Sequence, residues 1–159
     1  MKGDPAIIRL LNTVLTNELT AVNQYFLHAR MFQNWGFVQL GKIVYEESIE
    51  EMKHADKLIK RVLFLDGLPN LQDLNKLSIG ETVFEAMAAD LALEIGGRGT
   101  LVDGVAQCER AQDFVSREIL VDILDDTEEH IDFLETQLAL VRSLGEQNYL
   151  QSALGEMDE

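Results

Sequence analysis

The apolar residues of this 159-residue chain recur at spacings of three and four along almost its whole length. That spacing is the period of an α-helix, and no segment of useful length shows the alternation of a β-strand. The pattern therefore predicts an all-α protein. Capping and helix-ending residues, such as Asp4 before Pro5 and Gly145 after the last long apolar pattern, mark the ends of helices. The first two predicted helices cover residues 5–34 and 40–65, and a third begins at 79. The boundary between the third and the fourth helix is poorly marked, and Asp113 is the expected N-cap of the fourth, which reaches 144. A short helix is expected at 149–154.

The three connections between the four long helices are predicted to be short, long and short. The run Asp66-Gly67-Leu68-Pro69 ends the second helix, and about a dozen residues follow before the third. Ser78 and Glu81 have the spacing of a capping box, which would start the third helix at Ile79. We therefore expect a four-helix bundle of up-down-down-up order, with a long crossover between helices two and three and a short fifth helix. The pattern indicates a single domain over residues 1–159.

The charge of the chain is strongly one-sided, because 28 Asp and Glu residues outnumber 13 Lys and Arg residues and give a net charge of −15. Such a surface repels phosphate backbones and anionic lipids, so we expect no nucleic acid and no membrane as partner and favour cations. The one cysteine, Cys108, cannot form an internal disulfide and fits a reducing compartment. The first residues contain no apolar signal segment, and no apolar run approaches the ~18 residues of a membrane helix. We therefore expect a cytoplasmic protein.

Polar side chains interrupt the apolar stripe of every long helix near its middle. They are Glu18 on the first helix, Glu47, Glu51 and His54 on the second, Glu94 on the third, and Thr127 and His130 on the fourth. A buried carboxylate without a partner costs several kcal/mol, and several at one depth repel one another. A cation between them removes both costs, and the spacing of Glu51 and His54 places two ligands on one helix face. Carboxylate and imidazole ligands without a thiolate favour iron or manganese over structural zinc.

Each of these residues also has an interpretation without a metal. A buried glutamate could pair with Arg98, a histidine could hydrogen-bond within the core, and Glu47 could accept a hydrogen bond without binding an ion. The chain would then be a structural four-helix module whose polar groups satisfy one another. The matching depth on four helices favours the metal site.

Several segments resemble the bacterioferritin family, over the whole length of the chain. They are Asn17–Ala21, Asn23–Arg30, Glu51–Asp56, Leu68–Leu74 and Gln147–Leu150. The resemblance implies a ferritin-like bundle, a hollow shell of 24 subunits that stores ferric mineral, and a di-iron ferroxidase centre inside each subunit. It also implies the iron ligands, which are Glu18, Glu51 and His54 for one iron and Glu94 and His130 for the other.

Position 127 departs from the family pattern. The fourth-helix motif of bacterioferritins is Glu-x-x-His, whereas this chain has Thr127 three residues before His130. Four carboxylates balance two Fe²⁺ ions but three do not, and a threonine hydroxyl is a poor ligand for a hard cation. We therefore expect a weakened second iron site and slow Fe(II) oxidation by this subunit alone. The alternative is a rebuilt site in which water or Glu128, about 100° around the helix, replaces the missing carboxylate.

A second apolar stripe runs beside the first and carries Met52. Spacing alone predicts that this stripe packs against another subunit. The resemblance implies instead that Met52 from each of two subunits ligates one b-type haem, in a pocket lined by Leu19, Asn23, Phe26, Tyr45 and Ile49. In the family this haem passes electrons inward for iron release, often from a small [2Fe–2S] ferredoxin. Some bacteria combine a haem-binding subunit with one that has the complete di-iron centre, so we expect a second bacterioferritin subunit in a hetero-oligomeric shell.

Overall fold

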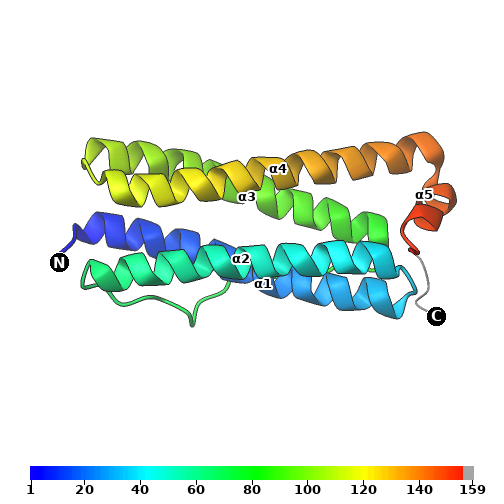
Figure 1. The fold of residues 1–159 in the computed structure, drawn as a ribbon, viewed down its shortest axis with the longest axis horizontal. Coiled ribbons are helices and arrows are strands. Elements are labelled where there is room, and N and C mark those ends of the chain that lie inside the picture. The colour runs from blue at the N-terminus through cyan, green and yellow to red at the C-terminus, as the bar shows by residue number, and fades with distance from the viewer. Residues whose placement is uncertain (156–159) are drawn as a thin grey trace.

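The helices predicted from the sequence are present in the computed structural model, which describes residues 1–155. Four long helices and one short helix form an elongated bundle (Figure 1). They are α1 (Pro5–Asn34), α2 (Val38–Phe64), α3 (Val83–Arg110), α4 (Phe114–Leu144) and α5 (Glu146–Ser152). The all-α fold is confirmed, while residues 156–159 of the predicted domain lie outside the described residues. No helix of the described part has the length and apolar character needed to cross a bilayer.

Two antiparallel helix pairs make up the bundle. α1 packs along α2, and α3 packs along α4 (Figure 1). The segment between α2 and α3 runs along the bundle, so these two helices point in the same direction. α5 lies at the end where α4 finishes, and its Tyr149 is buried. The up-down-down-up order with a short fifth helix is therefore confirmed, although α5 begins at Glu146 rather than at Tyr149.

Side chains of α1 hold the crossover, residues 65–82, against the bundle. Gln24 Oε1 accepts a hydrogen bond from the backbone N–H of Ser78 at 3.1 Å. His28 Nε2 accepts another from the backbone N–H of Gly80 at 3.0 Å. Because buried amides need partners, these two side chains allow an irregular segment to lie on a helix surface.

The same two side chains of α1 also bind Asp90 of α3. Asp90 Oδ1 accepts a hydrogen bond from Gln24 Nε2 at 2.9 Å and lies 2.8 Å from His28 Nδ1. Since His28 Nε2 accepts the Gly80 amide, its proton is on Nδ1, which donates to Asp90. All three side chains are buried, so this network fixes α3 against α1.

The predicted start of the third helix at Ser78 and Glu81 was wrong. α3 begins at Val83, and its cap is Thr82, whose Oγ1 accepts a hydrogen bond from Glu85 N–H at 3.1 Å. The Glu85 carboxylate accepts a hydrogen bond from Glu81 N–H at 2.9 Å. The physical reason is that the Ser78 amide donates to α1, which keeps the residues before Thr82 out of the helix.

Two apolar clusters fill the bundle, one toward each end. One cluster includes Phe32 and Leu138, and the other includes Leu11 and Ile123. The residues that contribute to the two clusters change over near the middle of each long helix. A layer of buried polar side chains occupies this boundary, at the depth that the sequence predicted.

Asp113 caps α4, as predicted. Its carboxylate accepts hydrogen bonds from Ser116 N–H at 3.0 Å and from the Ser116 hydroxyl at 2.6 Å, and it pairs with Arg61 Nη2 at 2.8 Å. Burial raises the pKa of Asp113, but the hydrogen bonds from Ser116 and the charge of Arg61 outweigh burial and hold the pKa below its usual value.

Asp113→Ala is expected to lower the free energy of unfolding by about 1–2 kcal/mol, because a helix cap and an ion pair are lost together. Asp113→Asn keeps a capping side chain without the charge, so its free energy of unfolding should lie between those of the parent and Asp113→Ala. The contribution of the charge is present at neutral pH and disappears as the pH falls through the lowered pKa. Urea unfolding at pH 7 and along a series below pH 4 measures both effects. Equal stability of the parent and Asp113→Ala at pH 7 would contradict this assignment.

Candidate metal centre

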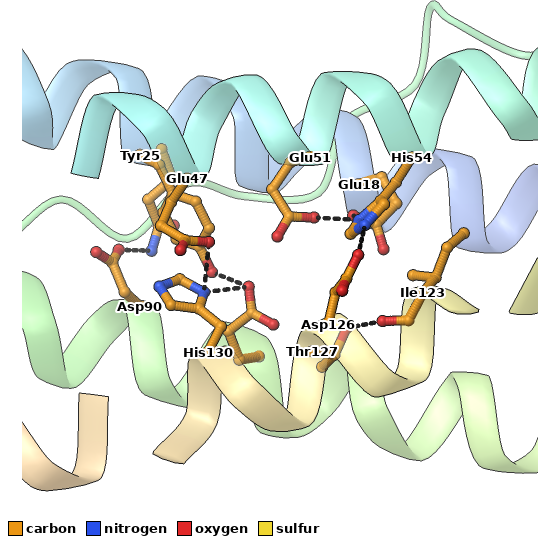
Figure 2. Close-up of polar contacts among 12 residues, drawn as sticks. Glu18, Tyr25, Glu47, Glu51, His54, Asp90, Ile123, Asp126, Thr127 and His130 are labelled. Atoms are coloured by element: carbon orange, nitrogen blue, oxygen red, sulfur yellow. Dashed lines mark hydrogen bonds and ion pairs between the residues drawn. The ribbon is translucent and has the colours of Figure 1, made fainter. Parts of the chain in front are cut away.

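The predicted metal ligands lie together in the polar layer between the two apolar clusters. Glu18, Glu51, His54, Glu94 and His130 are all buried, with 3–6% of their surface exposed. They come from all four long helices. Figure 2 shows that the labelled members of this group point toward one another across the bundle.

Glu18, Glu51 and His54 form the first cluster. Their ligand atoms lie within 4.8 Å of one another. His54 Nδ1 is 3.5 Å from Glu18 Oε2 and 3.4 Å from Glu51 Oε2. Glu18 Oε2 is buried and has no hydrogen bond to any described residue. A cation would stabilise a buried carboxylate oxygen that has no hydrogen bond and lies beside a second carboxylate, so these residues fit a metal ion.

His130 is at the centre of the second cluster. Its Nδ1 lies 3.1 Å from Glu94 Oε1 and 3.7 Å from Glu47 Oε2. The ligand atoms of Glu47, Glu51 and His130 lie within 4.8 Å of one another. Glu94 also accepts a hydrogen bond from the Tyr25 hydroxyl. Glu51 therefore belongs to both clusters, and Glu47, whose role the sequence left open, lies beside the second.

The Thr127 hydroxyl is engaged by its own helix. It is buried and donates a hydrogen bond to the Ile123 carbonyl at 2.8 Å (Figure 2). Glu128, the alternative carboxylate, pairs with Arg98 at 2.8 Å, and both side chains are about half exposed. Arg98 therefore pairs with a surface glutamate, and the proposed pairing of Arg98 with a buried glutamate is not formed.

Without a metal, the centre holds protons on its ligands. Burial lowers the pKa of His54, but Glu18 and Glu51 outweigh burial and raise it to about 11. Burial also lowers the pKa of His130, but the hydrogen bond and the charge of Glu94 outweigh burial and raise this pKa to about 9. Burial and repulsion from Glu18 raise the pKa of Glu51 to about 8. A cation that binds here at neutral pH must therefore displace protons.

The contact of Asp126 with the centre was not predicted from the sequence. Asp126 Oδ2 lies 2.7 Å from His54 Nε2, on the side of the ring away from the two glutamates. A metal-binding histidine usually donates its second ring N–H to an acceptor that orients it, so the sequence could have indicated that such an acceptor exists. The spacing could not identify the acceptor, because Asp126 belongs to an acidic run on α4. Asp126 also lines a cavity of about 340 Å³ beside the centre, together with Glu47, Glu50 and Glu129.

The predicted haem residues lie on α1 and α2, away from the buried centre. They are Leu19, Asn23, Phe26, Tyr45, Ile49 and Met52. Met52, Phe26 and Ile49 are 46%, 44% and 39% exposed, and the rings of Phe26 and Tyr45 are 6.0 Å apart. Leu19 is buried, and its carbonyl accepts a hydrogen bond from Asn23 Nδ2 at 2.7 Å. An exposed thioether among apolar side chains fits an apolar cofactor whose metal accepts a sulfur ligand.

The bundle and its buried carboxylates are those of a ferritin-like protein, and the family model described as a ferritin-like domain matches residues 8–144. A bacterioferritin of Mycobacterium leprae is 50% identical over 94% of each chain. A bacterioferritin of Brucella melitensis is 47% identical over 100% of this chain and 99% of its own. A bacterial ferritin of Pseudomonas aeruginosa is 47% identical over 97% of this chain and 100% of its own. This chain therefore belongs to the bacterioferritin family.

Proposed function

We propose that the chain is an iron-storage subunit of a hollow, cytoplasmic shell of 24 subunits, and that residues 1–159 form one domain. The observation that carries this proposal is the buried cluster of Glu18, Glu51 and His54, in which one carboxylate oxygen has no hydrogen bond. Two buried carboxylates that share one histidine and lack full hydrogen bonding destabilise a fold, and binding of a cation would offset this free-energy cost. The bacterioferritin relatives support iron as that cation.

Two Fe²⁺ ions are the substrates of the proposed ferroxidase reaction. Glu18, Glu51 and His54 would bind the first ion, and Glu94 and His130 would bind the second with Glu51 between them. Each Fe²⁺ gives one electron to O₂, which also takes up two protons to form hydrogen peroxide. Carboxylates are hard ligands and favour the ferric product, so a centre rich in glutamate lowers the free energy of oxidation.

Met52 and its exposed apolar neighbours support the second part of the proposal. Met52 would ligate haem together with the same residue of a second subunit, and Phe26, Tyr45, Ile49 and Asn23 would line the pocket. A haem bound there supplies one-electron transfer, which releases stored iron when a donor such as a small [2Fe–2S] ferredoxin reduces it. Paired thioether ligands favour the reduced iron and suit this direction of electron flow.

Because Thr127 replaces a glutamate, two candidate functions remain for the second iron site. In the first candidate, the weakened site makes oxidation slow, and a second bacterioferritin subunit with the complete centre joins the same shell. In the second candidate, this chain is self-sufficient because another carboxylate replaces the one missing at Thr127. The position of Glu47 beside His130 favours the second candidate.

The metal-free protein, produced as the only subunit, should take up Fe(II) in air and retain it as mineral inside an assembled shell. Size-exclusion chromatography with detection of iron and protein measures this, and iron that elutes apart from the shell would overturn the storage function. The rate for the first two Fe(II) ions per subunit separates the candidates. Rapid oxidation favours the self-sufficient centre, whereas slow oxidation that a co-produced second subunit accelerates favours the mixed shell.

A further inference from the structure

We infer that Glu47 supplies the carboxylate that position 127 lacks, so that Glu47, Glu51, Glu94 and His130 together bind the second cation. This inference rests on the proposed function, since it concerns the second iron of the same centre. The sequence suggested Glu128 or water as the substitute for the missing carboxylate, whereas Glu47 belongs to a different helix, α2.

The contacts of His130 define where the second cation binds. His130 Nδ1 lies 3.1 Å from Glu94 Oε1 and 3.7 Å from Glu47 Oε2. Bonds of about 2.1 Å to one ion place neighbouring ligand atoms about 3.0–3.7 Å apart. The imidazole nitrogen is therefore already at ligand spacing from both carboxylates. Glu51 completes the group, because its ligand atom lies within 4.8 Å of those of Glu47 and His130.

The periodicity of α2 brings Glu47 to the centre. Glu47, Glu51 and His54 occupy positions i, i+4 and i+7, which form one stripe of a helix. Figure 2 shows Glu47 directed toward His130 and His54 toward Glu18, with Glu51 between them. One helix thus delivers ligands to both cation sites.

Three nearby acidic residues other than Glu47 already pair with basic groups. These pairs are Asp126 with His54 at 2.7 Å, Glu50 with Lys53 at 2.9 Å and Glu128 with Arg98 at 2.8 Å. Glu47 instead faces His130, which is itself a predicted ligand. Among these carboxylates, Glu47 is the one that can bind an ion without giving up a lysine, an arginine or the histidine of the first site.

Glu47 also restores the charge balance of the centre. Glu18, Glu51 and Glu94 carry three negative charges, whereas two divalent cations carry four positive charges, so Glu47 provides the missing one. Glu18 Oε2 of the first cluster, which is buried without a hydrogen bond, independently favours a cation at the centre that Glu51 shares between the two clusters. The Glu47 side chain is 31% exposed, so the second site is closer to water than the first.

Equilibrium binding of Co²⁺ to the assembled, metal-free protein tests the inference without any oxidation. The parent protein should bind two Co²⁺ ions per subunit at the centre, detected by their d–d absorption. Glu47→Gln should keep the first ion with unchanged affinity and bind the second about 100-fold more weakly or worse, because a charged ligand is lost. Glu50→Gln, from the same helix and cavity, is the matched control and should bind two ions as the parent does.

The double variant Glu47→Gln/Thr127→Glu should recover the second ion, because it returns a carboxylate to α4. Unchanged binding of two ions by Glu47→Gln, or binding of only one by the parent, would overturn the role of Glu47 and leave the proposed function in place. A parent that binds no Co²⁺ at the centre would overturn the proposed function itself. If Glu47→Gln does not assemble, Glu47→Asp tests the same point. Its side chain is one methylene shorter, so its carboxylate lies farther from the second ion and should bind it more weakly than the parent does.

Discussion

Met52→Leu is expected to abolish haem binding, the largest effect that a single substitution should have on this protein. The parent, reconstituted with haem, should bind one haem per two subunits, because Met52 of each subunit supplies one thioether from a surface of exposed apolar side chains. Leucine has nearly the volume of methionine, so the packing of this surface should be retained, but it has no sulfur to ligate iron. Absorbance in the Soret region, referred to protein concentration, measures the occupancy.

A matched control for the Met52 experiment is Met31→Leu, which removes a thioether from α1 and leaves the Met52 sulfur in place. Met31→Leu should bind haem as the parent does. If Met52→Leu kept one haem per two subunits, haem ligation by this methionine would be wrong, and the exposed stripe would be an interface between subunits only.

Glu51→Gln should remove both cation sites at once, because Glu51 belongs to both clusters. Glutamine has the same shape, so the bundle should still assemble, but neither cluster would keep the charged ligand that the ions share. Co²⁺ binding should fall from two ions per subunit to none at concentrations that saturate the parent. Glu46→Gln, which changes an exposed residue of the same helix, should leave both sites intact.

The same Glu51 substitution should stabilise the metal-free protein at alkaline pH. Burial and the charge of Glu18 raise the pKa of Glu51 from 4.5 to about 8, so the folded protein keeps a proton that the unfolded chain loses. The free energy of unfolding therefore decreases as the pH rises from 4.5 to 8. His54, with a pKa raised from 6.5 to about 11, extends the decrease to higher pH. Thermal unfolding in the presence of a chelator should show a steeper fall of Tm between pH 6 and pH 9 in the parent than in Glu51→Gln, and parallel falls would contradict this account.

The helix ends could be predicted from sequence where neighbouring residues decide them. Asp4 caps α1 by accepting a hydrogen bond from Ala6 N–H at 2.9 Å, and Gly145 ends α4 with a φ of 81°. The depth of the predicted metal ligands could also be predicted, because helical periodicity alone places Glu18 and Glu94 on inward faces. Both kinds of prediction depend on contacts within one turn or one helix.

Contacts between distant segments could not be predicted in the same way. Ser78 has the local signature of a cap, but Gln24, which is 54 residues away, binds its amide instead. Nothing local shows that Asp126 contacts His54, which is 72 residues away. The side chain of Glu47 could equally have been an acceptor or a ligand, since only the packing of α2 against α4 brings it beside His130.

The hydrogen-bond network of Gln24, His28 and Asp90 has a consequence for iron turnover. Asp90 precedes Glu94 by one turn of α3, so a slide of that helix along its neighbour would break buried hydrogen bonds before it displaced the ligand. The position of Glu94 relative to Glu18 of α1 is thus held by groups one turn away along the two helices. We therefore expect Glu18 and Glu94 to keep their spacing when cations bind to the proposed centre and leave it.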